Sequence, residues 1–161
     1  MRNVPVITAV AIAGFACAAQ AQSSAVTPSA IEAYGKGVQI YTCMSANGQY
    51  AWRLKAPDAS LTDASGKPIG KHFAGPTWQA TDGSTVVGSP LNVSSSPDAG
   101  AVPWLVLQAK SHGGKGLMSN VDYVVRTRTE GGVAPTSGCD ADHAGAEVRV
   151  PYSAIYLFFR H

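Results

Sequence analysis

Apolar and polar residues alternate with a period of two along most of the chain after Gly37, which is the pattern of half-buried β-strands. Residues 38–43 and 49–54 are rich in β-branched and aromatic side chains, and Asn47-Gly48 between them is a strong hairpin signal. We therefore predict that these two segments are adjacent antiparallel strands.

The same alternation returns in shorter segments separated by Gly, Pro, Asp and Ser, the residues that form turns. Residues 89–100 have the composition of a loop. The other strands that the pattern predicts are 69–74, 77–81, 85–87, 104–110, 117–129, 147–150 and 152–159.

Short strands at this spacing predict an all-β fold, and we favour an antiparallel β-sandwich, with a small β-barrel as the alternative. The 17 glycines and 10 prolines agree with many tight turns and disfavour a helix bundle. At most one short N-terminal helix is expected, at 28–34, where Thr27 would cap it and Pro28 would occupy its first position.

The N-terminus has the features of a secretory signal peptide at residues 1–21. Arg2 precedes an apolar run, and Ala19-Gln20-Ala21 fits a cleavage site. We predict a mobile leader at 22–29 and a single β-domain at 30–161. The apolar run is shorter than the roughly 20 residues that span a bilayer, so no membrane span is predicted and the expected location is periplasmic or secreted.

The composition and charge of the chain limit the classes of partner that it can bind. Hydrophobic residues make up 45% of the 161 residues and charged residues 14%, which predicts a folded chain. The 12 Lys and Arg against 10 Asp and Glu give a net charge of +2, and the basic residues are scattered. We therefore expect no nucleic-acid partner.

Two cysteines, Cys43 and Cys139, remain after the predicted signal peptide. An exported protein meets an oxidising compartment, so a disulfide between them is the expected state. The alternative is a thiol nucleophile or a metal ligand, although the chain has no Cys-x-x-Cys motif.

The segment 70–78 offers the first candidate binding site. His72 lies between glycine-containing stretches, Trp78 supplies a flat apolar face, and Asp82 follows in a turn, so the three side chains could orient a small ligand. The competing interpretation is structural, with Trp78 in the core and His72 bonded to a backbone carbonyl.

A second candidate is the loop that carries Cys139. Asp140, Asp142 and His143 supply oxygen and nitrogen donors within four residues, and together with His72 or His112 they could hold a divalent metal. The competing interpretation is a solvated polar loop. Lys110 to Gly116, which includes His112, fits a glycine hairpin turn better than an anion-binding nest.

Several phrases of the chain, in order, resemble a known family. They are GVQIYTC at 37–43, IGKHFAGPTW at 69–78, DGS at 82–84, VPWL at 102–105, GGVAP at 131–135, GCD at 138–140 and EVRVPY at 147–152. The chain resembles the secreted bacterial and fungal proteins catalogued as domain of unknown function three-four-five-five, from about residue 30 to residue 160. The resemblance implies export and a single domain, and it carries no reaction, ligand or catalytic residue.

These observations favour non-catalytic binding of a small ligand or a cell-envelope component, with no catalytic residue assigned. The predicted ligand-binding residues are His72, Trp78, Asp82, His112 and Asp140. The first alternative is a metal-dependent enzyme or redox protein that uses His72, His112, Asp140 and His143. The second is an inhibitor or interaction module, and no cofactor or oligomeric state is predicted.

Overall fold

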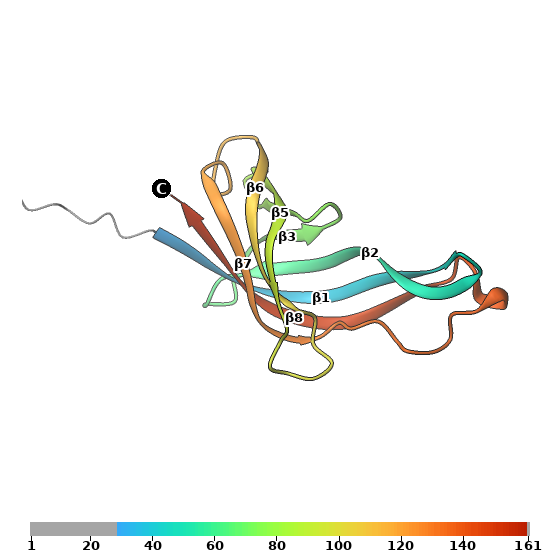
Figure 1. The fold of residues 1–161 in the computed structure, drawn as a ribbon. Helices are drawn as coiled ribbons and strands as arrows, with labels where there is room; N and C mark the ends of the chain where they lie inside the picture. The colour runs from blue at the N-terminus through green and yellow to red at the C-terminus, as the bar shows by residue number, and fades with distance from the viewer. Residues whose placement is uncertain (1–28, 161) are drawn as a thin grey trace, which may run out of the picture.

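The computed structural model describes residues 29–160 and consists almost entirely of β-strands (Figure 1). The signal peptide predicted at 1–21 and nearly all of the predicted leader lie outside the described residues. The strands are β1 (Ser29–Ala46), β2 (Gln49–Thr62), β3 (Pro68–Phe73), β4 (Thr77–Ala80), β5 (Thr85–Ser94), β6 (Trp104–Gly113), β7 (Val121–Gly131) and β8 (Glu147–Arg160), with one 3₁₀ turn, η1 (Ala141–His143), before β8.

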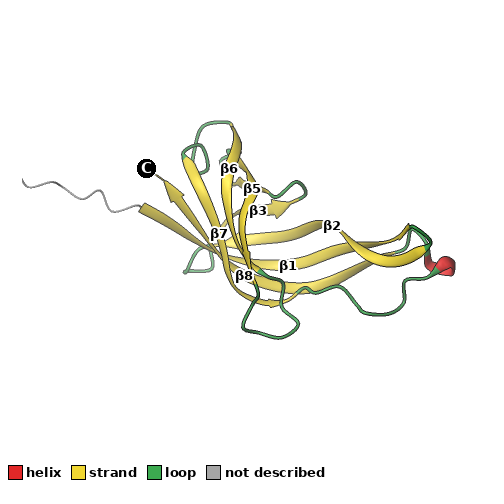
Figure 2. Cartoon of the chain, viewed as in Figure 1, coloured by secondary structure: helices red, strands yellow, loops and turns green. Residues whose placement is uncertain are grey.

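Each strand pairs antiparallel with the next one in sequence, and β1 also pairs with β8 (Figure 2). The predicted all-β antiparallel class is therefore confirmed. Because β1 and β8 join, the eight strands form one closed barrel, and the architecture follows the barrel alternative, since a sandwich would leave two separate sheets.

The predicted first hairpin is confirmed. Ala46 pairs with Gln49, and Asn47 and Gly48 both have positive φ, 52° and 76°, as the tight turn requires. The helix expected at 28–34 is wrong over its described part. β1 begins at Ser29, and Tyr34 pairs with Thr62 on one side and Ile155 on the other. Two long neighbouring strands supply hydrogen bonds to this segment, so tertiary pairing overrides a local N-terminal helix signal.

The loop expected at 89–100 begins later than predicted, because β5 continues to Ser94. The register of β5 against β6 shifts between Pro90 and Asn92. A strand tolerates proline at such an irregularity, where no ladder hydrogen bond is needed from it. Beyond it, Val93 pairs with Leu105.

Side chains alternate between the inside and the outside of the barrel. On β8 the inward set is Tyr152, Ala154, Tyr156 and Phe158, each buried, whereas the residues between them are partly exposed. Inward residues of the other strands complete one apolar core, which includes Leu61, Trp78, Val86, Leu107, Val121 and Val124. The core fills much of the interior, as expected for eight strands.

The up-and-down order divides the connections between two ends. We call the end with the β2–β3, β4–β5 and β6–β7 connections the closed end, and the end with the β1–β2, β3–β4, β5–β6 and β7–β8 connections the open end. Ser29 pairs with Arg160, so the first and last described residues lie together at the closed end.

The β6–β7 connection seals the closed end. Met118 lies in this connection and is fully buried in the core. Its backbone N–H donates to Ser84 Oγ at 3.0 Å, and Leu117 N–H donates to Asp82 Oδ2 at 2.7 Å. Asp82 Oδ1 in turn accepts from the backbone N–H and the hydroxyl of Ser84, at 2.9 and 2.5 Å. Two turns are thereby joined through one carboxylate and one buried hydroxyl.

At the open end, β1 and β2 extend past the barrel and form an arm with the β7–β8 connection and the first residues of β8 (Figure 1). The predicted disulfide is confirmed, and Cys43 on β1 is bonded to Cys139 in the arm. Cys43 also exchanges backbone hydrogen bonds with the segment 145–146, and Trp52 Nε1 donates to Ser137 O at 2.9 Å. Among residues 29–160 there is no helix with the length and hydropathy needed to cross a bilayer.

Candidate ligand-binding site

His72 and Trp78 form a stacked pair inside the barrel near the open end. They are direct partners in the β3–β4 register, so their side chains point to the same face. Their ring centroids are 4.4 Å apart and their planes differ by 3°. His72 is 3% exposed and Trp78 1%. Both therefore belong to one buried aromatic unit.

The His72 ring is neutral near neutral pH. Burial lowers its pKa from 6.5 to about 4, and the charge of Arg126 acts in the same direction, although the hydrogen bond to Thr77 opposes both. Nδ1 lies 2.9 Å from Thr77 O. A carbonyl oxygen only accepts, so Nδ1 carries the proton and donates, and Nε2 of the neutral ring has an acceptor lone pair.

A cavity of about 280 Å³ opens beside this pair. Its lining is mostly apolar and comes from seven strands, β1 to β7, and the β3–β4 turn. The lining residues are Gln39, Leu54, Pro57, His72, Pro76, Trp78, Pro90, Leu105, Leu107 and Arg126. We call this the mouth cavity, because its residues lie on the halves of the strands that lead to the open end.

Two buried donors in the lining of the mouth cavity have no hydrogen-bond partner among the described residues. They are Gln39 Nε2, in a side chain that is 2% exposed, and Trp78 Nε1. A buried amide or indole N–H without a partner costs about 1–3 kcal/mol, and native folds rarely retain one without a reason.

Arg126 adds a positive charge to the lining. Its Nε and Nη2 atoms donate to Pro103 O at 3.0 and 2.8 Å, which fixes the guanidinium. The ion pairs of residues 29–160 join other residues, Lys55 with Glu147, His143 with Asp140 and Arg149 with Asp58. The guanidinium therefore has no carboxylate partner within the described part of the chain.

Aromatic residues of β8 support the pair from behind. The Tyr156 ring lies edge-on to His72 and to Trp78, with centroid distances of 5.3 and 5.7 Å. Room for the Trp78 ring depends on Gly88 of β5, where a Cβ would lie 3.1 Å from Trp78 Cζ3 and 3.0 Å from a Leu107 methyl carbon. The rings are thus held in place by packing before any ligand is considered.

A family model described as "Protein of unknown function (DUF3455)" matches residues 22–160. The chain belongs to this family. Searches of curated proteins and of solved structures found no match. The resemblance noted from the sequence motifs is thereby confirmed, and the family description carries no reaction or ligand.

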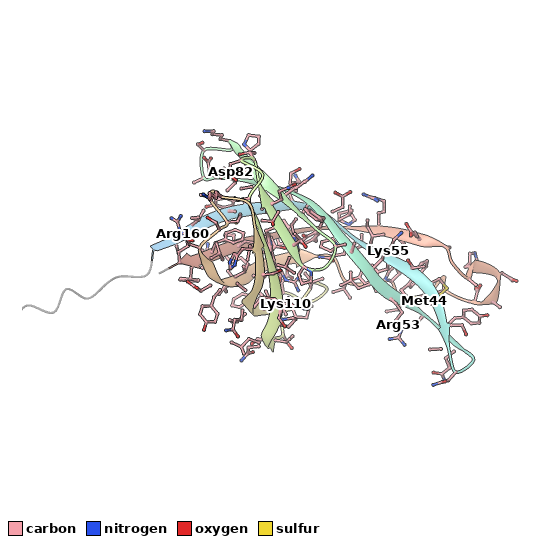
Figure 3. All side chains as sticks on the ribbon, turned by 90° about the horizontal axis from the view of Figure 1, so that it is seen from above. Met44, Arg53, Lys55, Asp82, Lys110 and Arg160 are labelled. Carbon is pink, nitrogen blue, oxygen red and sulfur yellow. A yellow bond between two sulfur atoms is a disulfide. The ribbon has the colours of Figure 1, made fainter. Side chains whose placement is uncertain are left out.

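The predicted ligand-binding residues are not all brought together. His72 and Trp78 share the mouth cavity, but Asp82 lies in the β4–β5 turn at the other end of the barrel, far from the arm that carries Met44 (Figure 3). Hydrogen bonds from Ser84 and Leu117 lower the pKa of the Asp82 carboxyl and engage both of its oxygens. Asp82 therefore lies outside the mouth cavity that contains His72, and its carboxylate joins the β4–β5 turn to the β6–β7 connection.

His112 and Asp140 also lie away from the mouth cavity. His112 is near the closed end, where its Nε2 lies 2.7 Å from Val121 O. Asp140 lies in the arm and caps η1, accepting from the backbone N–H groups of Asp142 and His143 at 3.1 Å. They do not form one ligand site with His72.

The metal-centre alternative required at least three donors to converge. Asp140 and His143 do meet, with Oδ1 and Nδ1 2.6 Å apart. His72 is buried inside the barrel and His112 is bonded near the closed end, and residues 29–160 contain no group of three or more His, Cys, Asp or Glu side chains able to hold a metal. The four residues therefore do not build the predicted centre.

Sequence reasoning missed Gln39 and Arg126. Gln39 had a usable signal, because it alternates with Gly37, Tyr41 and Cys43 on the face that is turned inward. Arg126 had no such signal. The register of β7 shifts between Val121 and Tyr123, so Val124 and Arg126 face inward, whereas plain alternation from Val121 would turn Tyr123 and Val125 inward.

Proposed function

We propose that the protein binds a small, largely apolar ligand in the mouth cavity without catalysing a reaction. The observation that carries this proposal is the stacked His72–Trp78 pair beside an apolar cavity that also contains an unpartnered buried donor, Gln39 Nε2. Ligand sites are typically apolar concavities with a few placed polar groups.

The architecture supports binding. An eight-stranded barrel has an interior that side chains fill or that holds one small ligand. Here the closed end is plugged by Met118, and the cavity lies toward the open end. The ligand would therefore enter and leave at the open end.

The lining favours binding over catalysis. Among the described residues that line the mouth cavity there is no Ser, Thr, Cys, Lys, Asp or Glu, the usual nucleophiles and carboxylate bases. The ring of His72 remains, and its lowered pKa makes it a weak base at neutral pH.

We further propose that the protein is exported and meets its ligand, or a cell-envelope component, in the periplasm or outside the cell. The Cys43–Cys139 disulfide supports this location, since such bonds persist in oxidising compartments.

The test is titration with N-phenyl-1-naphthylamine, a neutral dye that fluoresces in apolar sites. Leu54 lines the cavity and is 59% exposed, whereas Leu91 is 63% exposed and outside the lining, so Leu54→Trp and Leu91→Trp are matched variants. We expect saturable binding by the wild type and by Leu91→Trp, and binding weaker by roughly tenfold or more in Leu54→Trp. Equal binding by all three, or no saturable binding, would overturn the proposal.

A further inference from the structure

We propose that the natural ligand of the mouth cavity is a small free carboxylic acid with an apolar tail, whose carboxylate is bound by Arg126 and the neighbouring N–H donors. This inference rests on the proposed function and specifies its ligand class. Among the described residues of the lining, three features support this inference: buried N–H donors without partners, a guanidinium without a carboxylate partner, and a small apolar space beside them.

The N–H groups of the lining that have no hydrogen-bond partner need an acceptor. Gln39 Nε2 and Trp78 Nε1 donate and have no partner among the described residues, and a guanidinium has donors only. A ligand that satisfies these groups must present acceptor oxygens. An alcohol can accept one of these hydrogens and donate its own to His72 Nε2, but it is neutral, whereas a carboxylate accepts at two oxygens and carries the charge opposite to that of the guanidinium.

Because Arg126 is positively charged and has no carboxylate partner among the described residues, an anionic acceptor should bind better than a neutral one. Arg149, by comparison, is exposed and pairs with Asp58 at 2.5 Å, whereas Arg126 lies partly buried in a lining without carboxylates. Among the described residues of that lining, the only other titratable group is His72, which is neutral and adds no compensating charge. Guanidinium and carboxylate form strong, directional hydrogen bonds, and these gain strength where water is excluded.

The rest of the cavity limits the tail. Leu54, Pro57, Pro76 and Leu105 offer apolar contacts and no hydrogen bonds from their side chains. The volume of about 280 Å³ is just below the roughly 300–1,000 Å³ typical of ligand pockets. A free acid of modest length fits this space, and octanoate is a suitable probe.

The experiment is calorimetric titration of the oxidised protein with octanoate, octan-1-ol and octylamine at pH 7. These probes share one tail and differ in the head group. We expect octanoate to bind at least roughly tenfold more tightly than octan-1-ol, because charge-assisted hydrogen bonds are about twice as strong as neutral ones. We expect octylamine to bind most weakly of the three.

Arginine variants test whether Arg126 binds the carboxylate. Arg126→Gln is expected to weaken octanoate binding roughly 10- to 100-fold and to leave octan-1-ol binding nearly unchanged. Arg128→Gln is the matched control, since Arg128 lies on the same strand, is exposed and is outside the lining, and it should bind octanoate as the wild type does. Arg126→Lys should recover part of the lost affinity, because it restores the charge without the planar donor pair.

The outcomes separate this inference from the proposed function. Equal affinity for octanoate and octan-1-ol, with Leu54→Trp blocking both, would overturn the carboxylate and retain the ligand site. Octanoate binding that Arg126→Gln and Arg128→Gln reduce equally would also overturn it. If no probe binds the wild type and the dye does not bind either, both proposals fail together. The comparison of probes on the wild type needs no variant, so misfolding of Arg126→Gln cannot obscure the result.

Discussion

The two ends of the barrel differ in whether their polar side chains have hydrogen-bond partners. At the closed end, Asp82 accepts hydrogen bonds from Ser84 and from the backbone N–H of Leu117, and the Ser84 hydroxyl accepts from the backbone N–H of Met118. At the open end, Gln39 and Trp78 keep buried donors that have no partner among the described residues. A polar group that is fully satisfied within the fold serves stability, whereas one left unsatisfied at a cavity points to a ligand.

Truncating Met118, which fills the closed end, should destabilise the barrel without altering the mouth cavity. Met118→Ala deletes a fully buried side chain, and such changes cost about 2–5 kcal/mol because a cavity remains. Urea unfolding measures the loss, and Leu91→Ala, at a 63% exposed position, is the control that should change little. Dye affinity equal to that of the wild type, in conditions where the variant is folded, would support the division. A large loss of affinity would show that the two ends are coupled.

Acid should destabilise the open end through His72. The folded-state pKa of about 4 lies below the unfolded value of 6.5, so the unfolded chain binds the extra proton first. The contribution to stability is full above pH 6.5 and is lost as the pH falls toward 4, by about 3 kcal/mol. The measurement is the free energy of unfolding of the wild type and His72→Asn across this range. Parallel curves for the two proteins would contradict the prediction.

Removing the Ser84 hydroxyl from the hydrogen-bond network at the closed end should lower the free energy of unfolding moderately. Ser84→Ala leaves Asp82 without its hydroxyl donor and Met118 N–H without its acceptor, and an unsatisfied buried group costs about 1–3 kcal/mol. Chemical unfolding measures this loss. Ser60→Ala, at an exposed β2 position, is the control. A Ser84→Ala variant as stable as the control would show that this hydrogen-bond network contributes no stability.

The smallest effect on stability is expected at the open end. Gln39→Leu removes a buried donor that has no partner, so unfolding should be unchanged or up to about 1 kcal/mol more difficult. Octanoate affinity should fall at the same time. A clear loss of stability would mean that the Gln39 amide serves the fold, which would remove it from the proposed site.

The local part of the fold was predictable from the sequence. The first hairpin followed from Asn47-Gly48, and the disulfide followed from the two cysteines that remain after the predicted signal peptide. The closure of the sheet was not decided, because alternation describes the two faces of a strand and not its neighbours. The pairing of β1 with β8, which makes the barrel, joins the two ends of the sequence.

The candidate site was half predictable. His72 and Trp78 stand close in sequence on either side of one tight turn, so their meeting needed only a local hairpin. Asp82 is equally near in sequence but follows β4, and one strand length places it at the opposite end. Arg126 reaches the lining through a register irregularity in β7, which depends on pairing with β8 and leaves no periodic signal.

The pairing of Ser29 with Arg160 has a practical consequence for how the molecule is oriented. A tether, tag or surface linkage attached before Ser29 or after Arg160 would hold the protein by its plugged face. The open end and the arm would then point away from the support, toward the surrounding fluid (Figure 1). Immobilisation through either terminus is therefore the geometry of choice for measuring uptake from solution.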